Sequence, residues 1–405
     1  MERDEERIGR LVAALAAADL DAVCCRLPQN VLLLTGYWPM LGNATALLTR
    51  AGDLALIVPA DEQEFARRGW VAPEAIAPFT PVTLEHQGDT GEATRPLLAA
   101  AARRLGLAKA AVGYEGGAEF APAPYVALYT GNTASLDLYR AVLPDAGFWD
   151  ATDLLARERA ALTPREVRCV HQACTLAAHG FRAAAAAIHP GATEAEIAAA
   201  THARIMADSL RSEGPRAAAH AFCMAGPRSA DAYRAYALTD GRALAPGDFV
   251  LVHLNSCLDG FWTDLTRTYV LGEPDGRQLA MYEAVLEARG RALRAVRDGA
   301  RGSEVDAAAR DHLKAAGFGA AFKHQLGHGV GYGAIYHGNR PRLHPCSDDV
   351  LRTGMTFNVE PAVYIEGFGG LRHCDVAAAQ AEQANLLSPF HASLDDLIIG
   401  SENEK

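Results

Sequence analysis

Apolar positions follow two different spacings in the first part of the chain. In residues 7–20 they recur every three or four positions, which predicts an amphipathic helix. Short apolar runs follow and predict a buried strand at 21–25 and two strands within 45–60, around a turn at 50–53. Helical and strand patterns then alternate to about residue 150. The pattern therefore predicts a small α/β domain at the N-terminal end.

A helix start signal opens the second part of the chain. Thr163 suits the N-cap, Pro164 suits the first helical position, and an alanine-rich stretch of high helix propensity follows at 183–187. A chain of 405 residues, half of them hydrophobic, also exceeds one ordinary core. We therefore predict two domains, residues 1–155 and residues 156–405.

The second domain carries an internal repeat. Residues 190–197 resemble residues 298–305, since in both a Gly-Ala turn precedes a predicted helix. A strand pair follows each helix, and the four predicted strands are 246–255, 261–270, 353–361 and 369–377. Two such units could close around a pseudo-twofold axis.

Side chains of metal-binding types occupy matching places in the two strand pairs. Strand side chains alternate between faces, and a short connection brings His253 near Asp264 across the first hairpin. Glu360 and Cys374 take corresponding places in the second pair, and His328 lies between glycines. A single such residue is usually structural. Four residues related by a repeat, together with a glycine-flanked His, indicate a site for a divalent metal ion.

The charge and hydropathy of the chain exclude some classes of binding partner. The net charge is −11 and no basic stripe occurs, so nucleic acid is not expected. No apolar run approaches the thickness of a bilayer, and the charged N-terminus lacks the apolar core of a secretory signal. The eight cysteines form no CxxC pair, which is typical of reduced thiols. We expect a cytoplasmic protein that acts on a small molecule, without a membrane partner.

The ordered motifs PGDFVLVHLN, GHGVG, TFNVEP and GGLRHCD resemble those of the pita-bread metallopeptidases of family M24. This family includes prolidase, aminopeptidase P, methionine aminopeptidase and creatinase. The segment LDAVCCRLPQNVLLLTGY is similar to the start of a creatinase-type N-terminal domain. The resemblance implies an α/β (α+β) fold, with a creatinase-like domain followed by a pita-bread domain with an internal pseudo-twofold repeat. It also implies a homodimer.

The family binds two metal ions through Asp, Asp, His, Glu and Glu. The resemblance puts His253, Asp264, His328, Glu360 and Cys374 at these positions, so that His replaces the first Asp and Cys replaces the last Glu. A dinuclear site needs anionic bridges, and His and Cys favour zinc or iron over manganese. We therefore expect one divalent metal ion, zinc or iron. A metal-free mechanism like that of creatinase stays open.

Other functional positions of the family are also altered. A substrate-contacting His of the family is replaced by Tyr233 or Tyr236, and a His after GHGVG is displaced to His337. Arg340 and Arg372 could hold a substrate carboxylate through bidentate contacts, although each could equally form an ordinary ion pair. The candidate catalytic side chains are His253, His337, Glu360 and Tyr236, and the candidate substrate-binding side chains are Tyr233, Arg340 and Arg372.

These features favour a hydrolase of a C–N bond in a small polar substrate, related to creatinase and the Xaa-Pro peptidases. One alternative is an Xaa-Pro aminopeptidase or dipeptidase with an unusual metal site, which a dipeptide panel would reveal. A second is an iron-dependent lyase or oxidative enzyme, which iron content and oxygen dependence would reveal. A third is a non-catalytic binding protein, against which the retention of Asp264, His328 and Glu360 argues.

Overall fold

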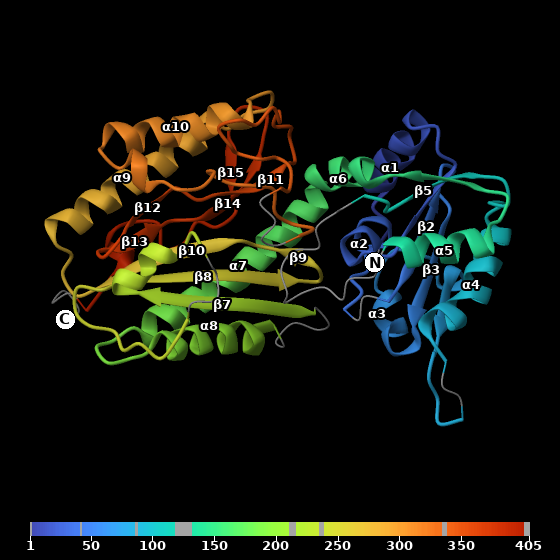
Figure 1. Cartoon of the computed structure of the whole chain (residues 1–405), viewed down its shortest axis with the longest axis horizontal. Helices are drawn as coiled ribbons and strands as arrows, with labels where there is room; N and C mark the ends of the chain where they lie inside the picture. The colour runs from blue at the N-terminus through green and yellow to red at the C-terminus, as the bar shows by residue number, and fades with distance from the viewer. Residues whose placement is uncertain are drawn as a thin grey trace. The chain divides into compact units, whose positions relative to one another are not determined.

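The structure is a computed structural model that describes residues 2–40, 43–85, 88–117, 132–209, 216–234, 239–333 and 338–400. The chain forms two compact units, Met1–Arg159 and Ala160–Lys405 (Figure 1). Each unit combines helices with its own β-structure, so the predicted fold class is confirmed. No helix in the described ranges is both long and apolar enough to cross a membrane.

The N-terminal unit is built on one six-stranded sheet in the order β4-β3-β2-β1-β5-β6. Its strands are β1 (Ala22–Cys25), β2 (Thr45–Thr49), β3 (Leu54–Pro59), β4 (Ile76–Phe79), β5 (Ala111–Tyr114) and β6 (Gly147–Asp150). Its helices are α1 (Glu5–Ala17), α2 (Pro28–Thr35), α3 (Gln63–Ala66), α4 (Thr90–Arg104), α5 (Asn132–Val142) and α6 (Thr152–Ala160). The helix predicted at 7–20 and the strands predicted within 45–60 are confirmed.

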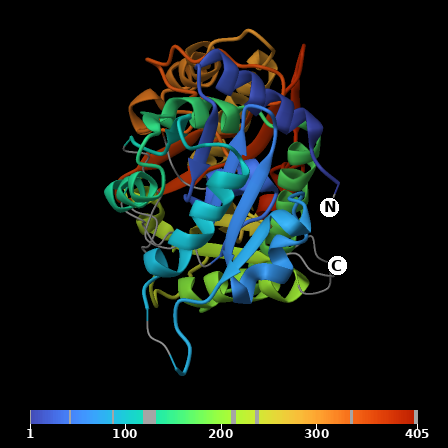
Figure 2. The same cartoon turned by 90° about the vertical axis from the view of Figure 1, so that its right-hand side faces the viewer.

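The core of this unit lies between its sheet and its longer helices. Cys24 and Leu47 of the sheet join Leu98 of α4 and Leu138 of α5 in one buried cluster. Figure 2 shows the blue strands of this sheet with the cyan helix α4 beside them. Strand side chains point alternately to opposite faces, and helices cover the apolar face on this side.

The first half of the C-terminal unit packs two helices on a sheet. The helices are α7 (Pro164–Ala187) and α8 (Glu194–Ser209), and the sheet has the order β16-β10-β8-β7 with β9 paired to β8. The strands are β7 (Ala217–Ala225), β8 (Phe249–Leu258), β9 (Phe261–Trp262), β10 (Leu265–Leu271) and β16 (Ile398–Ile399). Thr163 caps α7 in a capping box with Glu166, as its sequence predicts.

The second half repeats this plan with shorter strands. Its helices are α9 (Gly276–Ala295) and α10 (Gly302–Ala315). Its strands are β11 (Thr356–Val359), β12 (Ala362–Ile365), β13 (Gly369–Arg372), β14 (Asp375–Ala379) and β15 (Ala384–Leu386). In Figure 1 the two helix pairs enclose the strands of both halves, so the strand faces turned away from the helices meet between them.

Side-chain alternation on β8 determines what reaches this interior. Ser256 donates to the carbonyl oxygen of Ala173 in α7 at 2.9 Å, so its side of β8 faces the helices. His253 lies on the other side, where it contacts Arg372 of the second half. The interior between the repeats is therefore lined by His253 and its same-face neighbours.

Candidate metal centre and active site

The first strand pair brings His253 and Asp264 together. β8 and β10 are antiparallel, with His253 opposite Thr266, and Asp264 immediately precedes β10. The Nδ1 atom of His253 lies 3.8 Å from Oδ1 of Asp264, and both side chains are buried. The proximity predicted from the short connection between the two strands is therefore confirmed.

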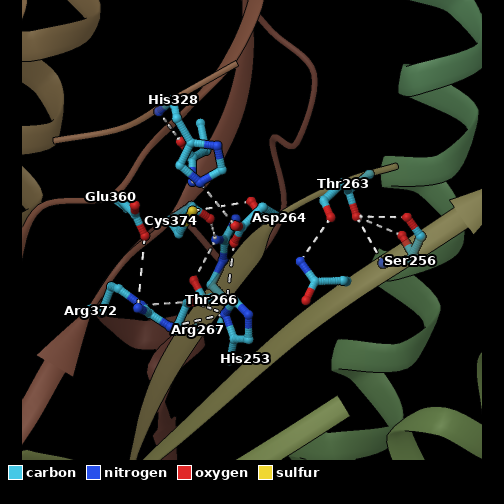
Figure 3. Close-up of polar contacts among 12 residues, drawn as sticks. His253, Ser256, Thr263, Asp264, Thr266, Arg267, His328, Glu360, Arg372 and Cys374 are labelled. Atoms are coloured by element: carbon cyan, nitrogen blue, oxygen red, sulfur yellow. Dashed lines mark hydrogen bonds and ion pairs between the residues drawn. The ribbon is translucent and has the colours of Figure 1, made fainter. Parts of the chain in front are cut away.

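The second strand pair adds Glu360 and Cys374. The backbone N–H of Cys374 donates to the carbonyl of Thr266 at 3.0 Å, which fixes Cys374 beside Asp264. The backbone N–H of Glu360 donates to the carbonyl of Leu326 at 2.8 Å. One ligand atom each from Asp264, Glu360 and Cys374 lies within 4.8 Å of the others, and all three residues are buried (Figure 3). We call these three residues the ligand cluster.

His328 joins the ligand cluster from the glycine-flanked loop. Its Nε2 lies 3.3 Å from Oδ2 of Asp264, and its Nδ1 lies 3.1 Å from the carbonyl oxygen of Gly329. A carbonyl only accepts hydrogen bonds, so Nδ1 carries a hydrogen, and Nε2 points to the carboxylate. At this distance Nε2 and the carboxylate oxygen share a proton, and a bound cation would take the place of that proton.

The flanking glycines explain how His328 reaches this place. A Cβ on Gly327 would lie 2.0 Å from the carbonyl oxygen of Asn358, and one on Gly329 would lie 1.9 Å from that of Arg340. Any side chain at either position would push the loop out. Asn358 also accepts the backbone N–H of His328 through Oδ1 at 2.7 Å. The loop is therefore held by close backbone packing and by one amide side chain.

Arg372 lies between His253 and Glu360. Its Nη2 donates to Nδ1 of His253 at 2.9 Å, its Nε donates to Oγ1 of Thr266 at 3.0 Å, and its Nη1 lies 3.8 Å from Oε2 of Glu360. A guanidinium has no acceptor, so the lone pair of His253 Nδ1 is engaged by Arg372. His253 is thus turned toward Arg372 and stands outside the ligand cluster.

The buried charges shift one another's pKa. Burial alone would raise the pKa of Asp264, but the neighbouring His253, the hydrogen bond with His328 and the charge of Arg372 hold it below its ordinary value. Burial and the charge of Asp264 raise the pKa of Glu360. Burial raises the pKa of Cys374 as well, so its thiol is neutral and donates to the carbonyl of Asp264 at 3.1 Å. A bound cation would favour release of the thiol proton.

An ion-pair network supports the strand that carries Cys374. Nη2 of Arg267 donates to Oδ1 of Asp375 at 2.7 Å, and Nη1 of Arg267 donates to the carbonyl of Cys374 at 2.6 Å. Arg289 also pairs with Asp375. We did not predict these roles from the sequence, although Arg267 and Asp375 lie within the predicted strands 261–270 and 369–377.

The remaining predicted residues lie in different surroundings. The ring of Tyr233 packs 5.5 Å from that of Tyr364, with Nζ of Lys323 4.5 Å above it. Arg340 is 47% exposed and pairs with Asp349 at 3.2 Å. The two predicted catalytic residues His337 and Tyr236 lie outside the described residues.

Known families and structures match most of the chain. Metallopeptidase family M24 matches residues 168–380, and the creatinase/prolidase N-terminal domain matches residues 7–161. The Xaa-Pro dipeptidase of Pyrococcus furiosus is 33% identical over 242 residues, which are 60% of this chain and 67% of that relative.

Two solved structures share the fold. The prolidase of Pyrococcus horikoshii OT3 has a TM-score of 0.74 at 25% identity and covers 95% of this chain and 98% of its own. The Xaa-Pro dipeptidase of Bacillus anthracis has a TM-score of 0.76 at 25% identity and covers 97% of this chain and 99% of its own. The structural likeness therefore extends over both units.

Proposed function

The chain belongs to metallopeptidase family M24, within the superfamily of creatinase and Xaa-Pro peptidase hydrolases, and on that basis we propose that it hydrolyses a C–N bond of a dipeptide-sized substrate at a centre with one divalent metal ion. The observation that carries the proposal is the ligand cluster, in which Asp264, Glu360 and Cys374 bring ligand atoms within 4.8 Å. His328 would be the fourth ligand through Nε2. An Asp, Glu, His and Cys set suits zinc or iron.

The residues fit one ion better than two. Carboxylates bridge a metal pair by giving one oxygen to each ion, and Cys374 offers a single sulfur in place of such a bridge. His253 Nδ1 accepts from Arg372 and is not available as a ligand. His328 Nε2 and Asp264 Oδ2 are 3.3 Å apart and both point to one place, where a cation would replace the proton that they share.

Each side chain would then have a distinct task. A bound divalent ion supplies Lewis-acid polarisation of the scissile carbonyl and of water. Glu360 accepts a proton from the attacking water at its carboxylate and returns it to the leaving amine nitrogen, as a general base and then a general acid. Arg372 positions the Glu360 carboxylate, 3.8 Å away, and fixes the ring of His253. Burial of these residues excludes bulk water from the reacting groups.

Metal analysis tests the proposed centre. We expect protein purified without added metal to contain close to one equivalent of zinc or iron per chain. Cys374→Ala should lose the metal ion, because Cys374 belongs to the ligand cluster. His253→Ala should keep the metal ion, because His253 lies outside that cluster. Metal retained in Cys374→Ala, or two equivalents in the unaltered protein, would contradict the one-ion centre. Hydrolysis of a dipeptide panel that stops on chelation and returns with the metal would support the reaction.

A second candidate is Xaa-Pro dipeptidase activity, which the relative from Pyrococcus furiosus carries in its name. The same dipeptide panel distinguishes this activity from the broader C–N hydrolase activity proposed above. Cleavage confined to Ala-Pro and other Xaa-Pro dipeptides would favour this second candidate. Comparable or faster cleavage of Ala-Ala, Ala-Gly and small amides would favour the broader reading, in which the altered ligand positions accompany a different substrate.

A further inference from the structure

The carboxyl ends of two parallel strands meet at one edge of the N-terminal sheet. β1 and β5 are parallel neighbours, and β2 adjoins β1 on its other side. The chain therefore leaves β1 in one direction and returns to it from the other, which makes this edge a topological switch point. Open α/β sheets bind their ligands beyond the carboxyl ends of the strands at such a point. Arg26 directly follows β1 at this edge.

The side chain of Arg26 lies on the face of the sheet that packs against α5. Strand side chains alternate, and Cys24, two residues before Arg26, shares a buried cluster with Tyr139 of α5. Nη1 of Arg26 donates to Oγ of Ser135, one turn before Tyr139, at 3.1 Å. Continuing the β1–β2 register by one residue puts Thr45 opposite Arg26, so the two side chains share this face. We call Arg26, Thr45 and Tyr139 the donor cluster.

Each member of the donor cluster has a buried polar atom without a partner. The three residues are 8%, 1% and 2% exposed, in the order Arg26, Thr45 and Tyr139. Nε of Arg26, Oγ1 of Thr45 and the hydroxyl of Tyr139 have no hydrogen-bond partner among the residues that the structure describes. The Tyr139 hydroxyl neighbours the thiol of Cys24, which is a weak hydrogen-bonding group. Three such atoms at one place are costly to bury, which indicates a ligand that satisfies them together.

The charge of Arg26 has no direct counterpart in the described part of the chain. Its guanidinium forms no ion pair with an Asp or Glu of the described residues, and Ser135, which it contacts, is neutral. Glu115 follows β5, but other donors engage its carboxylate: the backbone N–H groups of Arg26 and Leu27 at 2.8 and 3.0 Å, and Nδ2 of Asn30 at 2.8 Å. These bonds turn Glu115 toward the start of α2. A buried cation without a paired anion is unfavourable, so the donor cluster favours an anion from outside the chain.

The donors of this cluster suit a carboxylate. A guanidinium and hydroxyl groups all donate to oxygen atoms, and arginine is the usual partner of planar oxyanions. Burial raises the pKa of Tyr139, and it raises the pKa of Cys24 to about 12. The hydroxyl therefore keeps the proton that it would donate, and the thiol adds no negative charge. One buried positive charge balances one negative charge, and a phosphate group carries about −1.5 to −2 at neutral pH, so a carboxylate fits better.

We propose that Arg26, Thr45 and Tyr139 form a binding site in the N-terminal unit for the carboxylate group of a small molecule. The carboxylate oxygens accept from the Nε–H of Arg26 and from the two hydroxyls, and their charge offsets that of the guanidinium. All three residues belong to the N-terminal unit, so the site is separate from the metal centre and from the reaction proposed there. A bound carboxylate stabilises the N-terminal unit, because only the folded sheet brings the three donors together.

Titration of the full chain with sodium acetate tests the site. Isotope labelling of arginine gives an NMR resonance for the Nε–H of Arg26, identified by its absence in Arg26→Met, or in Arg26→Lys if Arg26→Met does not fold. Each titration is compared with sodium chloride at equal ionic strength, which removes general salt effects. We expect a saturable shift with acetate, and binding at least about ten-fold tighter than that of inorganic phosphate at about pH 8, because the second charge of phosphate has no partner. No saturable shift, or phosphate binding as tight as that of acetate, would overturn the proposal.

Variants of the two hydroxyl residues connect acetate binding to the donor cluster. Tyr139→Phe and Thr45→Val each remove one donor and keep most of the side-chain volume, so each should weaken acetate binding by about ten-fold. Arg103→Met is the matched control, because Arg103 is an exposed arginine of the same unit, on α4, and it should leave the affinity unchanged. Unchanged affinity in Tyr139→Phe or Thr45→Val would overturn the three-donor site.

Two further measurements separate this site from the metal centre and from a structural role of Arg26. Chelation should leave the acetate affinity unchanged, and loss of the shift after chelation would overturn the proposal. In chloride, Arg26→Met should unfold at the same temperature as the unaltered protein or higher, because it removes an unpaired buried charge. Acetate should raise the unfolding temperature of the unaltered protein and not that of Arg26→Met. An equal rise in both would overturn the proposal.

Discussion

Replacing Arg372 by Met should destabilise the C-terminal unit more than any surface arginine replacement. The guanidinium is 2% exposed and makes hydrogen bonds of 2.9 Å to His253 and 3.0 Å to Thr266, beside Glu360 at 3.8 Å. Methionine keeps much of the volume and removes the charge. Removing one partner of a buried charged network costs roughly 3–5 kcal/mol, since Glu360 and His253 would stay buried without it. We expect a loss of about that size in the free energy of unfolding.

Hydrogen–deuterium exchange of peptides from β8 and β10 measures this loss in the affected unit, and urea unfolding measures it for the chain. Arg340→Met is the matched control: Arg340 is 47% exposed in its pair with Asp349, so the loss should not exceed about 1 kcal/mol. Adding Glu360→Gln to Arg372→Met should cost less than the sum of the single changes, because the carboxylate then needs no cation. If Arg372→Met is no more harmful than Arg340→Met, the buried network does not stabilise the site.

Three further predictions concern pH, thiol reactivity and the altered ligand positions. Burial alone would raise the pKa of Asp349, but hydrogen bonds from Arg342 hold it below its ordinary value. Ionised Asp349 therefore stabilises the fold above its unfolded pKa of about 4, and this stabilisation is lost as the pH falls through its lower folded pKa. In Asp349→Asn the free energy of unfolding should decrease less steeply as the pH is lowered through this range. Cys346 is exposed and Cys374 is buried. A thiol reagent should therefore modify Cys346 rapidly in the native protein and Cys374 only after unfolding. Fast labelling of Cys374 in a Cys346→Ser variant would contradict its burial. The double variant His253→Asp with Cys374→Glu should raise the manganese or cobalt bound per chain above one equivalent, as elemental analysis would show, whereas Cys374→Glu alone should not.

The hydrophobic pattern predicted the strands of the site with a small shift. The strand predicted at 246–255 is β8, Phe249–Leu258, because the Pro-Gly-Asp turn occupies the first residues and Gly247 adopts a φ of +86° that ends the turn. The proximity of His253 to Asp264 follows from local chain geometry, since a short hairpin joins their strands. Local patterns were sufficient for this part of the site.

The contacts of Arg372 and Asn255 could not be predicted in the same way. Arg372 and His253 are 119 residues apart, and their contact depends on how the two repeats face each other. Asn255 lies between other polar residues of β8, and only the folded structure shows that its Oδ1 has no hydrogen-bond donor among the described residues. Long-range pairing of this kind leaves no periodic signal in the sequence.

The two altered ligand positions act together through the charge of the buried site. Asp264, Glu360 and the thiolate of Cys374 would carry three negative charges, and Arg372 carries one positive charge, so one divalent ion would make this buried group of charges neutral. A second divalent ion would leave two positive charges, which are costly to bury without further anions. With Asp in place of His253, the engaged nitrogen would become an anion beside Arg372 and the balance would shift toward a second cation. The exchange of Asp for His next to a buried guanidinium is therefore the physical reason to expect one ion in this member of the family.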